Sequence, residues 1–343
     1  MRISILLLAL AVGAPFVAAD QPAQRSKPQP APLEKLTVKH LPNALLVHPK
    51  VISGGLPDGD EAFQELKDLG VKTVISVDGA RPDVELAKKN GLRYVHLPHG
   101  YDGIPAERVE ELAKAVRDLP GPIYIHCHHG KHRSPVAASA ACVGAGLIDP
   151  KDARQVLVVA GTSESYRGLY QAAQEAKRFD DRLLDALGAE FPAVAKLPPM
   201  AEAMVDVEHI NNHLKLFAAN KWQPIKDQPA LQPDHEALLL REHFTELLRT
   251  KEIMAKSARF QELMKEGEAA AQDMETALKD WITAGRPEKT PETLAQGMDR
   301  IGKNCTACHK LFRDVPLGEK NRVALAVEPN AQSMLLERHS SAR

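Results

Sequence analysis

The pattern of apolar and polar residues divides the chain into two parts with different periodicities. From about residue 36 to residue 187, short runs rich in β-branched residues alternate with amphipathic stretches of helical spacing. The pattern predicts strands at 71–77, 92–97 and 122–125 and helices at 60–69, 82–90 and 105–119. Strands separated by helices of this length are typical of an α/β fold with a central, mostly parallel sheet flanked by helices.

The second part has no strand signal and begins after the Pro-punctuated segment 191–199. Stretches of helical periodicity cover 200–220, 233–254, 257–284 and 291–312. The last stretch has Thr290 as a predicted N-cap and Pro291 at its first position. Four helices of this length predict an all-α, antiparallel four-helix bundle.

The N-terminus has the features of a secretory signal peptide. An apolar run extends from Ile3 to Val17, and the small residues Ala18 and Ala19 suit cleavage before Asp20. An uncleaved membrane anchor is the alternative, although the run is short for a transmembrane helix. We therefore expect a periplasmic or secreted protein with no membrane span after cleavage.

The composition indicates that function depends on particular clusters of residues and not on the overall charge of the chain. The 343 residues carry a formal net charge of −1, which provides no broad attraction to nucleic acid or to anionic membranes. With 4% aromatic residues and four cysteines, the chain is neither an aromatic-rich binder of single-stranded nucleic acid nor a disulfide-stapled small domain. The predicted organisation is a signal peptide at 1–19, a tether at 20–35, an α/β domain at 36–190, a linker at 191–199, a helical bundle at 200–315 and a tail at 316–343.

One segment combines a strand, a loop and a helix around a cysteine. The strand is followed by His126-Cys127-His128-His129-Gly130-Lys131-His132-Arg133-Ser134, and a helix of small residues is predicted at 135–145. This order of Cys, five residues, Arg and Ser resembles the phosphate loop of cysteine-dependent protein tyrosine and dual-specificity phosphatases, over about 36–187. A loop at a helix N-terminus directs N–H groups inward, which favours a bound phosphate and the thiolate of Cys127.

The resemblance implies a role for each residue of this loop. Cys127 would attack phosphorus to form a cysteinyl-phosphate, Arg133 would hold two phosphate oxygens, and Ser134 would hydrogen-bond the departing thiolate. The remaining residues expected to bind the substrate are His128, His129, Gly130, Lys131 and His132.

The leaving oxygen also needs a proton donor. In this family the donor is an Asp on a loop after the preceding strand, and here Asp102 stands in that place, with Gly100 and Gly103 nearby to permit loop movement. Asp78, which follows an earlier strand, is the alternative donor.

The cysteine and the histidines of this loop are also found in two other kinds of site. A rhodanese-type sulfurtransferase also has a Cys loop below a helix, but the spacing from Cys to Arg favours phosphate chemistry. His128, His129 and His132 raise a metal cluster as an alternative, yet we expect them to point outward around an anion pocket. Cys142, about two turns into the helix, is predicted to be a core residue too distant from Cys127 for a disulfide.

A second motif lies near the end of the helical part. Cys305-Thr306-Ala307-Cys308-His309 is the c-type haem attachment pattern, in which two thiols bind the porphyrin and the adjacent His ligates iron. A thioredoxin-like redox pair is the alternative, but that pair would lie between a strand and a helix. The motif therefore predicts one covalent haem c held by Cys305, Cys308 and His309, with His309 as the iron ligand.

This motif on the last of four helices resembles cytochrome c-prime and its relatives, over about 200–312. In that family the first helix faces the open side of the haem, and alignment of the inward stripe puts Val207 there. Val cannot ligate iron, so we expect a five-coordinate haem with an apolar distal pocket suited to nitric oxide or carbon monoxide. Met204, one turn earlier, is the alternative sixth ligand.

Together the motifs predict an extracytoplasmic phosphomonoester hydrolase of dual-specificity type that carries a haem domain able to sense redox state or a gas. The competing hypothesis is a haem-binding or electron-transfer protein with an inactive, anion-binding phosphatase-like domain. Expected partners are a phosphorylated protein or small phosphoester, a gas ligand or electron-transfer partner and a second copy of the chain, but no nucleic acid. Phosphotyrosine, phosphoserine, phosphoinositide and small esters all remain open as substrates.

Overall fold

The computed structural model describes residues 33–320. The predicted signal peptide, most of the predicted tether and most of the predicted tail lie outside these residues. The sheet begins at Glu34, so the last two residues assigned to the tether belong to the fold instead. None of the described helices is long and apolar enough to cross a membrane.

Six strands form one mixed sheet in the order β1-β2-β3-β6-β4-β5. Their bounds are β1 Glu34–Lys35, β2 Leu45–His48, β3 Val51–Gly54, β4 Thr73–Ser76, β5 Arg93–His96 and β6 Ile123–His126. The pairs β3–β6, β6–β4 and β4–β5 are parallel, whereas β1–β2 and β2–β3 are antiparallel. The expected parallel sheet is thus correct for its centre and incomplete at one edge, because the short hairpin strands before residue 55 have no clear alternation.

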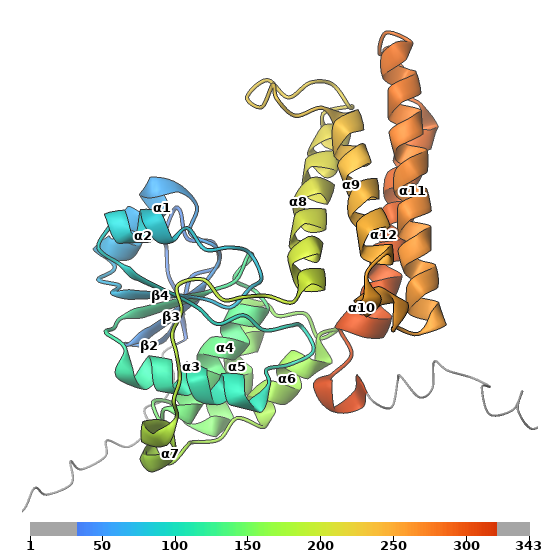
Figure 1. The fold of residues 1–343 in the computed structure, drawn as a ribbon. Coiled ribbons are helices and arrows are strands. Elements are labelled where there is room, and N and C mark those ends of the chain that lie inside the picture. The colour runs from blue at the N-terminus through green and yellow to red at the C-terminus, as the bar shows by residue number, and fades with distance from the viewer. Residues whose placement is uncertain (1–32, 321–343) are drawn as a thin grey trace, which may run out of the picture.

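Helices cover both faces of this sheet (Figure 1). One face packs against α1 Gly59–Asp68 and α2 Val84–Lys89, through residues such as Phe63 and Ala87. The other face packs against α3 Ala106–Asp118, α4 Arg133–Gly144, α5 Ala153–Ala160 and α6 Arg167–Gln174, and α7 Asp181–Ala186 lies against α3. Strands β4, β6 and β5 are largely buried on both faces, which explains why apolar residues follow one another at their centres instead of alternating with polar ones.

Helix α4 can lie directly against the sheet because its residues are small. Every residue from Ser134 to Gly144 is buried, and a Cβ at Gly144 would lie 2.7 Å from that of Ala113 on α3. This close packing fixes the N-terminus of α4 at the carboxyl end of β6, where the chain turns through the predicted phosphate loop.

The C-terminal helical region contains α8 Pro199–Ala219, α9 Pro233–Leu248, α10 Lys251–Met254, α11 Ala258–Thr283 and α12 Glu292–Cys308. Helix α8 packs on α9, α9 packs on α11, and α11 packs on α12 (Figure 1). The predicted inward stripe of α8 is confirmed, since Val207, Ile210, Leu214 and Phe217 are all buried in the core of this region. The predicted third and last helices also match, although α12 begins at Glu292 with Pro291 as its N-cap, one residue later than expected.

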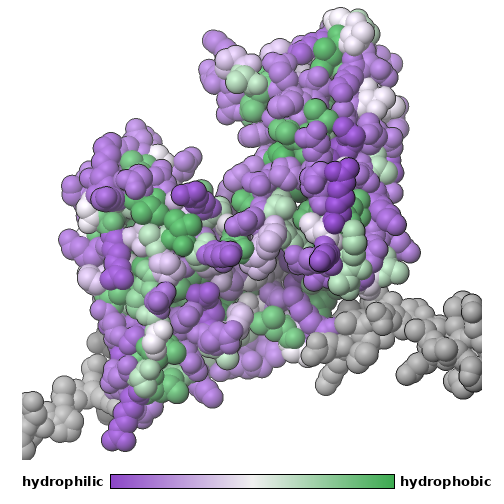
Figure 2. Space-filling view, in the orientation of Figure 1, coloured by the Kyte–Doolittle hydropathy of each residue, from purple (hydrophilic) through white to green (hydrophobic). Residues whose placement is uncertain are grey.

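After α12 the chain returns to the α/β region. A π-helical turn, His309–Arg313, leads to a short 3-10 turn, Leu317–Glu319. Leu317 N–H donates to the carbonyl oxygen of Asp102 at 2.9 Å, and Arg167 on α6 forms a bidentate ion pair with Glu319. Figure 1 shows this turn beside α6, and Figure 2 shows the hollow between the two regions, whose surfaces are mostly hydrophilic on this side.

Candidate functional site

Three carbonyl groups of the loop from Cys127 to His132 accept hydrogen bonds from residues outside the loop. Leu56 N–H donates to the His128 carbonyl at 3.1 Å, Asn43 Nδ2 to the His129 carbonyl at 2.7 Å, and Thr162 Oγ1 to the Lys131 carbonyl at 2.6 Å. Within residues 33–320, by contrast, the N–H groups of 128–132 donate to no protein acceptor. A loop with anchored carbonyls and free N–H donors at the start of a 12-residue helix is suited to a tetrahedral oxyanion.

Gly130 allows the loop to turn back against β3. Its φ of +71° lies in the left-handed region. A Cβ at this position would lie 2.4 Å from the N atom of Gly55 and 2.5 Å from the carbonyl carbon of Gly54. Only glycine fits here without displacing backbone, and this requirement explains the single glycine in a loop otherwise made of large polar residues.

The candidate nucleophile lies at the base of this loop. Cys127 is 2% exposed, and its Sγ lies 3.4 Å from Ser134 Oγ. Ser134 Oγ also donates to the Gly54 carbonyl at 2.9 Å, so its single proton cannot serve Gly54 and a Cys127 thiolate at once. The structure therefore brings the predicted nucleophile and its predicted helper into contact, with a hydroxyl rotation separating the two hydrogen-bonded states.

Arg133 is the first residue of α4 and lies close to the sulfur. Burial alone would lower the pKa of its guanidinium, but the neighbouring Tyr101 and Cys127 raise that pKa above its ordinary value. Its Nε is buried and has no hydrogen-bond partner among residues 33–320, and its guanidinium carbon lies 4.6 Å from the centre of the Tyr101 ring. A partly buried cation with an unused N–H donor beside the thiol is suited to recognition of a phosphate.

The two candidate proton donors differ in their surroundings. Asp102 is 12% exposed at its side chain, and its carboxylate forms an ion pair with Lys320. No described contact joins Asp102 to Cys127 or Arg133, although the adjacent Tyr101 touches Arg133. Asp78 is 2% exposed; its Oδ1 accepts from Ala80 N–H, and its buried Oδ2 has no partner within residues 33–320. Which of the two donates a proton stays a prediction.

Tyr101 is a site residue that the sequence interpretation missed. Its ring lies between two guanidinium groups, with Arg133 at 4.6 Å and Arg313 at 4.5 Å from the ring centre. It also contacts the rings of His132 and Tyr166. Its position next to the predicted acid Asp102 could have indicated a place in the site. Its contact with Arg313, which follows the haem motif in the sequence, has no local pattern that predicts it.

The remaining loop residues surround the entrance. His129 and Lys131 are exposed, whereas His128 and His132 are half-buried. Burial lowers the pKa of both His129 and His132, so they gain a proton only at a more acidic pH than an ordinary histidine. His129 and His132 therefore add little positive charge to the entrance of the loop near neutral pH.

All four cysteines are free thiols, as Cys142 was predicted to be. Burial in the α4 core raises the pKa of the Cys142 thiol, which makes it unreactive. Cys305 and Cys308, three residues apart on α12, are partly buried and pack together with Phe312 against the core of the helical region.

The residues of the second motif fit a covalently attached haem. Cys305 and Cys308 lie on one face of a helix, as both attachment points require. Burial lowers the pKa of His309 to about 4, so its imidazole is neutral and able to ligate a metal. Of the predicted distal residues, Val207 is buried and Met204 is partly buried against the same core.

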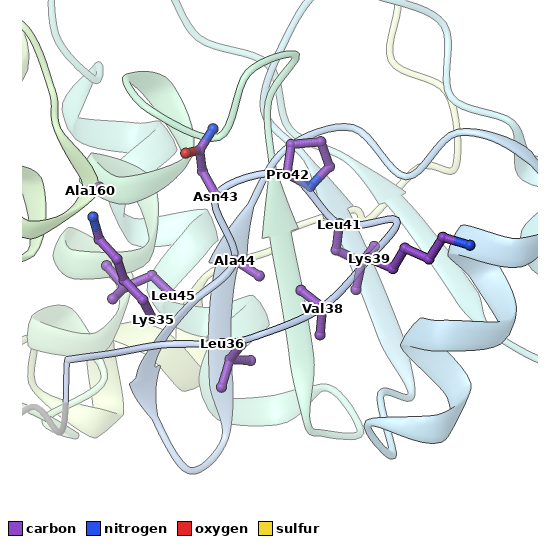
Figure 3. Close-up of a pocket in the computed structure, with 10 residues that line it drawn as sticks. All are labelled: Lys35, Leu36, Val38, Lys39, Leu41, Pro42, Asn43, Ala44, Leu45 and Ala160. Atoms are coloured by element: carbon purple, nitrogen blue, oxygen red, sulfur yellow. The ribbon is translucent and has the colours of Figure 1, made fainter.

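Two pockets of the described residues lie away from both motifs. A pocket of about 170 Å³ is lined by residues 35–45 and Ala160 (Figure 3). It lies behind the phosphate loop, because Asn43 on its wall anchors the His129 carbonyl. A larger one of about 670 Å³ lies between α11 and α12, among Met274, Trp281 and Gly297. Neither pocket is lined by Cys127 or Cys305.

Comparisons with known proteins give only distant structural similarity. No protein-family model matches the chain, and no curated protein does. Among solved structures, Pseudomonas aeruginosa TpbA in complex with pTyr is similar at 22% identity and a TM-score of 0.37, covering 46% of this chain and 96% of that one. The core catalytic domain of the PP-IP phosphatase SIW14 from Saccharomyces cerevisiae has 17% identity and a TM-score of 0.36, covering 43% and 91%. A Shewanella putrefaciens putative phosphatase has 21% identity and a TM-score of 0.32, covering 44% and 92%. At such low scores the similarity carries no argument, and function must be argued from the site.

Proposed function

We propose that this protein is an extracytoplasmic phosphomonoester hydrolase that acts through a cysteinyl-phosphate intermediate. The observation that carries the proposal is the loop geometry. Among the described residues, the five N–H groups at positions 128–132 donate to no protein acceptor in the loop that follows Cys127, and Arg133 has a buried Nε without a partner. Donors fixed in this way stabilise a transferring phosphoryl group without reorganisation.

The proposed reaction has two steps. In the first, the Cys127 thiolate attacks phosphorus, the bond to the leaving oxygen breaks, and an aspartic acid donates a proton to that oxygen. In the second, water attacks the cysteinyl-phosphate and gives a proton to the aspartate formed in the first step, which restores the acid. The S–P bond breaks and the thiolate departs while Ser134 turns its hydroxyl from the Gly54 carbonyl toward the sulfur. Arg133 holds the phosphoryl oxygens through both steps.

Asp102 is the proposed acid, with Asp78 as the alternative. Asp102 must exchange its ion pair with Lys320 for the leaving oxygen, and Gly103, with a φ of +131°, is a hinge suited to that movement. Asp78 would need no such exchange, because its Oδ2 is already free of partners. The ion pair of Asp102 is also the observation that favours the competing hypothesis of an inactive, anion-binding domain.

The helical region is proposed to be a four-helix bundle that holds one haem c through Cys305, Cys308 and His309. Such a group supplies redox chemistry or binding of a diatomic gas when it is present. Val207 would face its open side and exclude polar ligands. The segment that follows His309 contacts Tyr101 through Arg313, so the two regions are joined at the predicted acid loop.

Phosphatase assays of the mature protein test the enzymatic part. Hydrolysis of para-nitrophenyl phosphate should vanish in Cys127→Ser and fall in Arg133→Lys, whereas Cys142→Ser, a buried thiol away from the loop, should keep activity. Asp102→Ala and Asp78→Ala distinguish the two candidate acids. The variant in which the rate no longer falls on the alkaline side of its pH profile lacks the proton donor. Turnover unchanged in Cys127→Ser would reject the proposal. A pyridine haemochrome spectrum without the c-type band would separately reject the haem.

A further inference from the structure

Three side chains with metal-binding atoms meet at the entrance of the phosphate loop. His128 and His129 come from the loop, and Glu208 comes from α8 of the helical region. One ligand atom from each lies within 4.8 Å of the other two. Within the described residues, none of these three atoms is used in a hydrogen bond or an ion pair.

Two of the three side chains are carried on fixed backbone. The carbonyls of His128 and His129 accept hydrogen bonds from Leu56 and Asn43, and the two imidazole rings meet edge to face with centres 4.5 Å apart. Glu208 is one residue beyond the buried Val207, so the packing of α8 sets its position. The chain therefore holds the groups close together before any ion binds.

The distances suit one small transition-metal ion. Around zinc, bonds of about 2.1 Å in a tetrahedron place ligand atoms roughly 3.4 Å apart. Atoms that now lie within 4.8 Å reach that spacing by side-chain rotation, which is free because Glu208 and His129 are exposed. Two imidazoles and a carboxylate are a typical zinc donor set, and three protein ligands leave one position open for water.

The charges around Glu208 point the same way. This carboxylate is close enough to His129, Arg133 and His309 to interact electrostatically with each. The negative charge of Glu208 beside a pocket for phosphate repels the anion and partly offsets the attraction from Arg133. A divalent cation on Glu208 removes that repulsion and replaces it with attraction.

We propose that His128, His129 and Glu208 form a binding site for a divalent transition-metal ion such as zinc, bridging the phosphate loop and α8. This site differs from the cluster of three loop histidines that the sequence raises only as an alternative, because its third member is Glu208 rather than His132. His132 instead packs its ring against Tyr166, with centres 4.8 Å apart.

Zinc titration of tag-free, haem-loaded protein tests this site, with Cys127→Ser as the parent so that the thiol cannot bind metal. Calorimetry, with chelator competition for affinity and elemental analysis for stoichiometry, should find a single zinc ion per chain. His129→Ala and Glu208→Gln should each weaken binding by at least about tenfold. His132→Ala, in the same loop, and Glu202→Gln, exposed on the same helix, are matched controls that should bind as the parent does.

A ligand exchange completes the test, because Glu208→His supplies a different donor at the same position and should restore binding. Circular dichroism and the haem spectrum should be unchanged from the parent in every variant, since the side chains replaced in the parent are exposed or half-buried and none belongs to the buried core of either region. Absence of saturable binding, affinity unaltered in Glu208→Gln, or equal losses in the controls would overturn the proposal. The readout is metal bound per chain, so it stands whether or not the protein hydrolyses phosphoesters.

Discussion

Replacement of Gly130 by alanine tests the shape of the phosphate loop most directly. The new Cβ would lie 2.4 Å from the N atom of Gly55, whereas ordinary contacts begin near 3.4 Å, so the loop or β3 must shift by about 1 Å. The left-handed φ of +71° adds a backbone cost of roughly 1–2 kcal/mol, and overpacking adds roughly 1–3 kcal/mol. A displacement of about 1 Å at reacting groups lowers kcat/KM by about 100-fold.

Gly161→Ala is the matched control. Gly161 has a similar φ of +79°, but a Cβ there meets nothing within 4 Å, so only the backbone cost of roughly 1–2 kcal/mol applies. Urea unfolding followed by far-UV circular dichroism measures stability, and para-nitrophenyl phosphate hydrolysis measures kcat/KM. Fluorescence of Trp222 and Trp281 reports on the helical region alone and should show an unchanged transition.

We expect Gly130→Ala to lose far more activity than Gly161→Ala, and more stability. Equal kcat/KM in the two variants would refute the reasoning, because the loop would then tolerate a side chain where backbone now lies. A shift confined to the tryptophan transition would also contradict it.

Three further predictions concern other parts of the molecule. Lys320→Ala should raise kcat, because it frees the proposed acid Asp102 from its ion pair. A partly exposed pair contributes about 1 kcal/mol at most, so the increase should not exceed about fivefold. An unchanged kcat would mean that the pair does not restrain Asp102. Burial lowers the pKa of His126 to about 4, so below pH 6.5 the unfolded chain binds more protons at this residue than the folded chain does. The free energy of unfolding should therefore fall on acidification, by roughly 2 kcal/mol between pH 7 and pH 5. Urea unfolding at the two pH values should show a smaller loss in His126→Asn than in the unmodified protein. Glu275→Ala should destabilise the helical region by roughly 1–2 kcal/mol, since it removes the carboxylate that pairs with Arg241 and Lys279 while both cations stay partly exposed to water, and the tryptophan transition measures this loss.

Periodicity and turn residues predicted the central elements of the fold. Strands β4 and β5 lie inside the predicted ranges, and β6 extends one residue past its range, to His126. Each of these parallel strands has β-branched or aromatic residues at its centre, which is the signal that the sequence pattern detects. The hairpin of β1 to β3 was missed, since its first strand, Glu34–Lys35, is exposed and polar and no amphipathic helix separates β2 from β3. Short α5, α6 and α7 were missed for a similar reason: each has eight residues or fewer.

The site was predictable where one short segment builds it. The loop from Cys127 to Ser134 contains its own nucleophile, cation and glycine, so the local sequence shows them together. Groups brought in by tertiary packing gave no such signal. Lys320 and Glu208 lie in segments predicted to be a tail and a bundle helix, and their contacts with Asp102 and with the loop depend on how the two regions pack. His213 is a further example: its Nδ1 lies 2.8 Å from the buried carboxylate of Glu236 on α9, a contact that the pattern of α8 alone does not predict.

Mass spectrometry of the peptide containing Cys127, after rapid acid quench of the protein turning over a phosphomonoester, tests the central claim. The account predicts a phosphoryl group on the Cys127 sulfur, with a larger fraction modified in Ser134→Ala because departure of the thiolate is slowed. Sustained hydrolysis with no adduct on Cys127, in either protein, would contradict it.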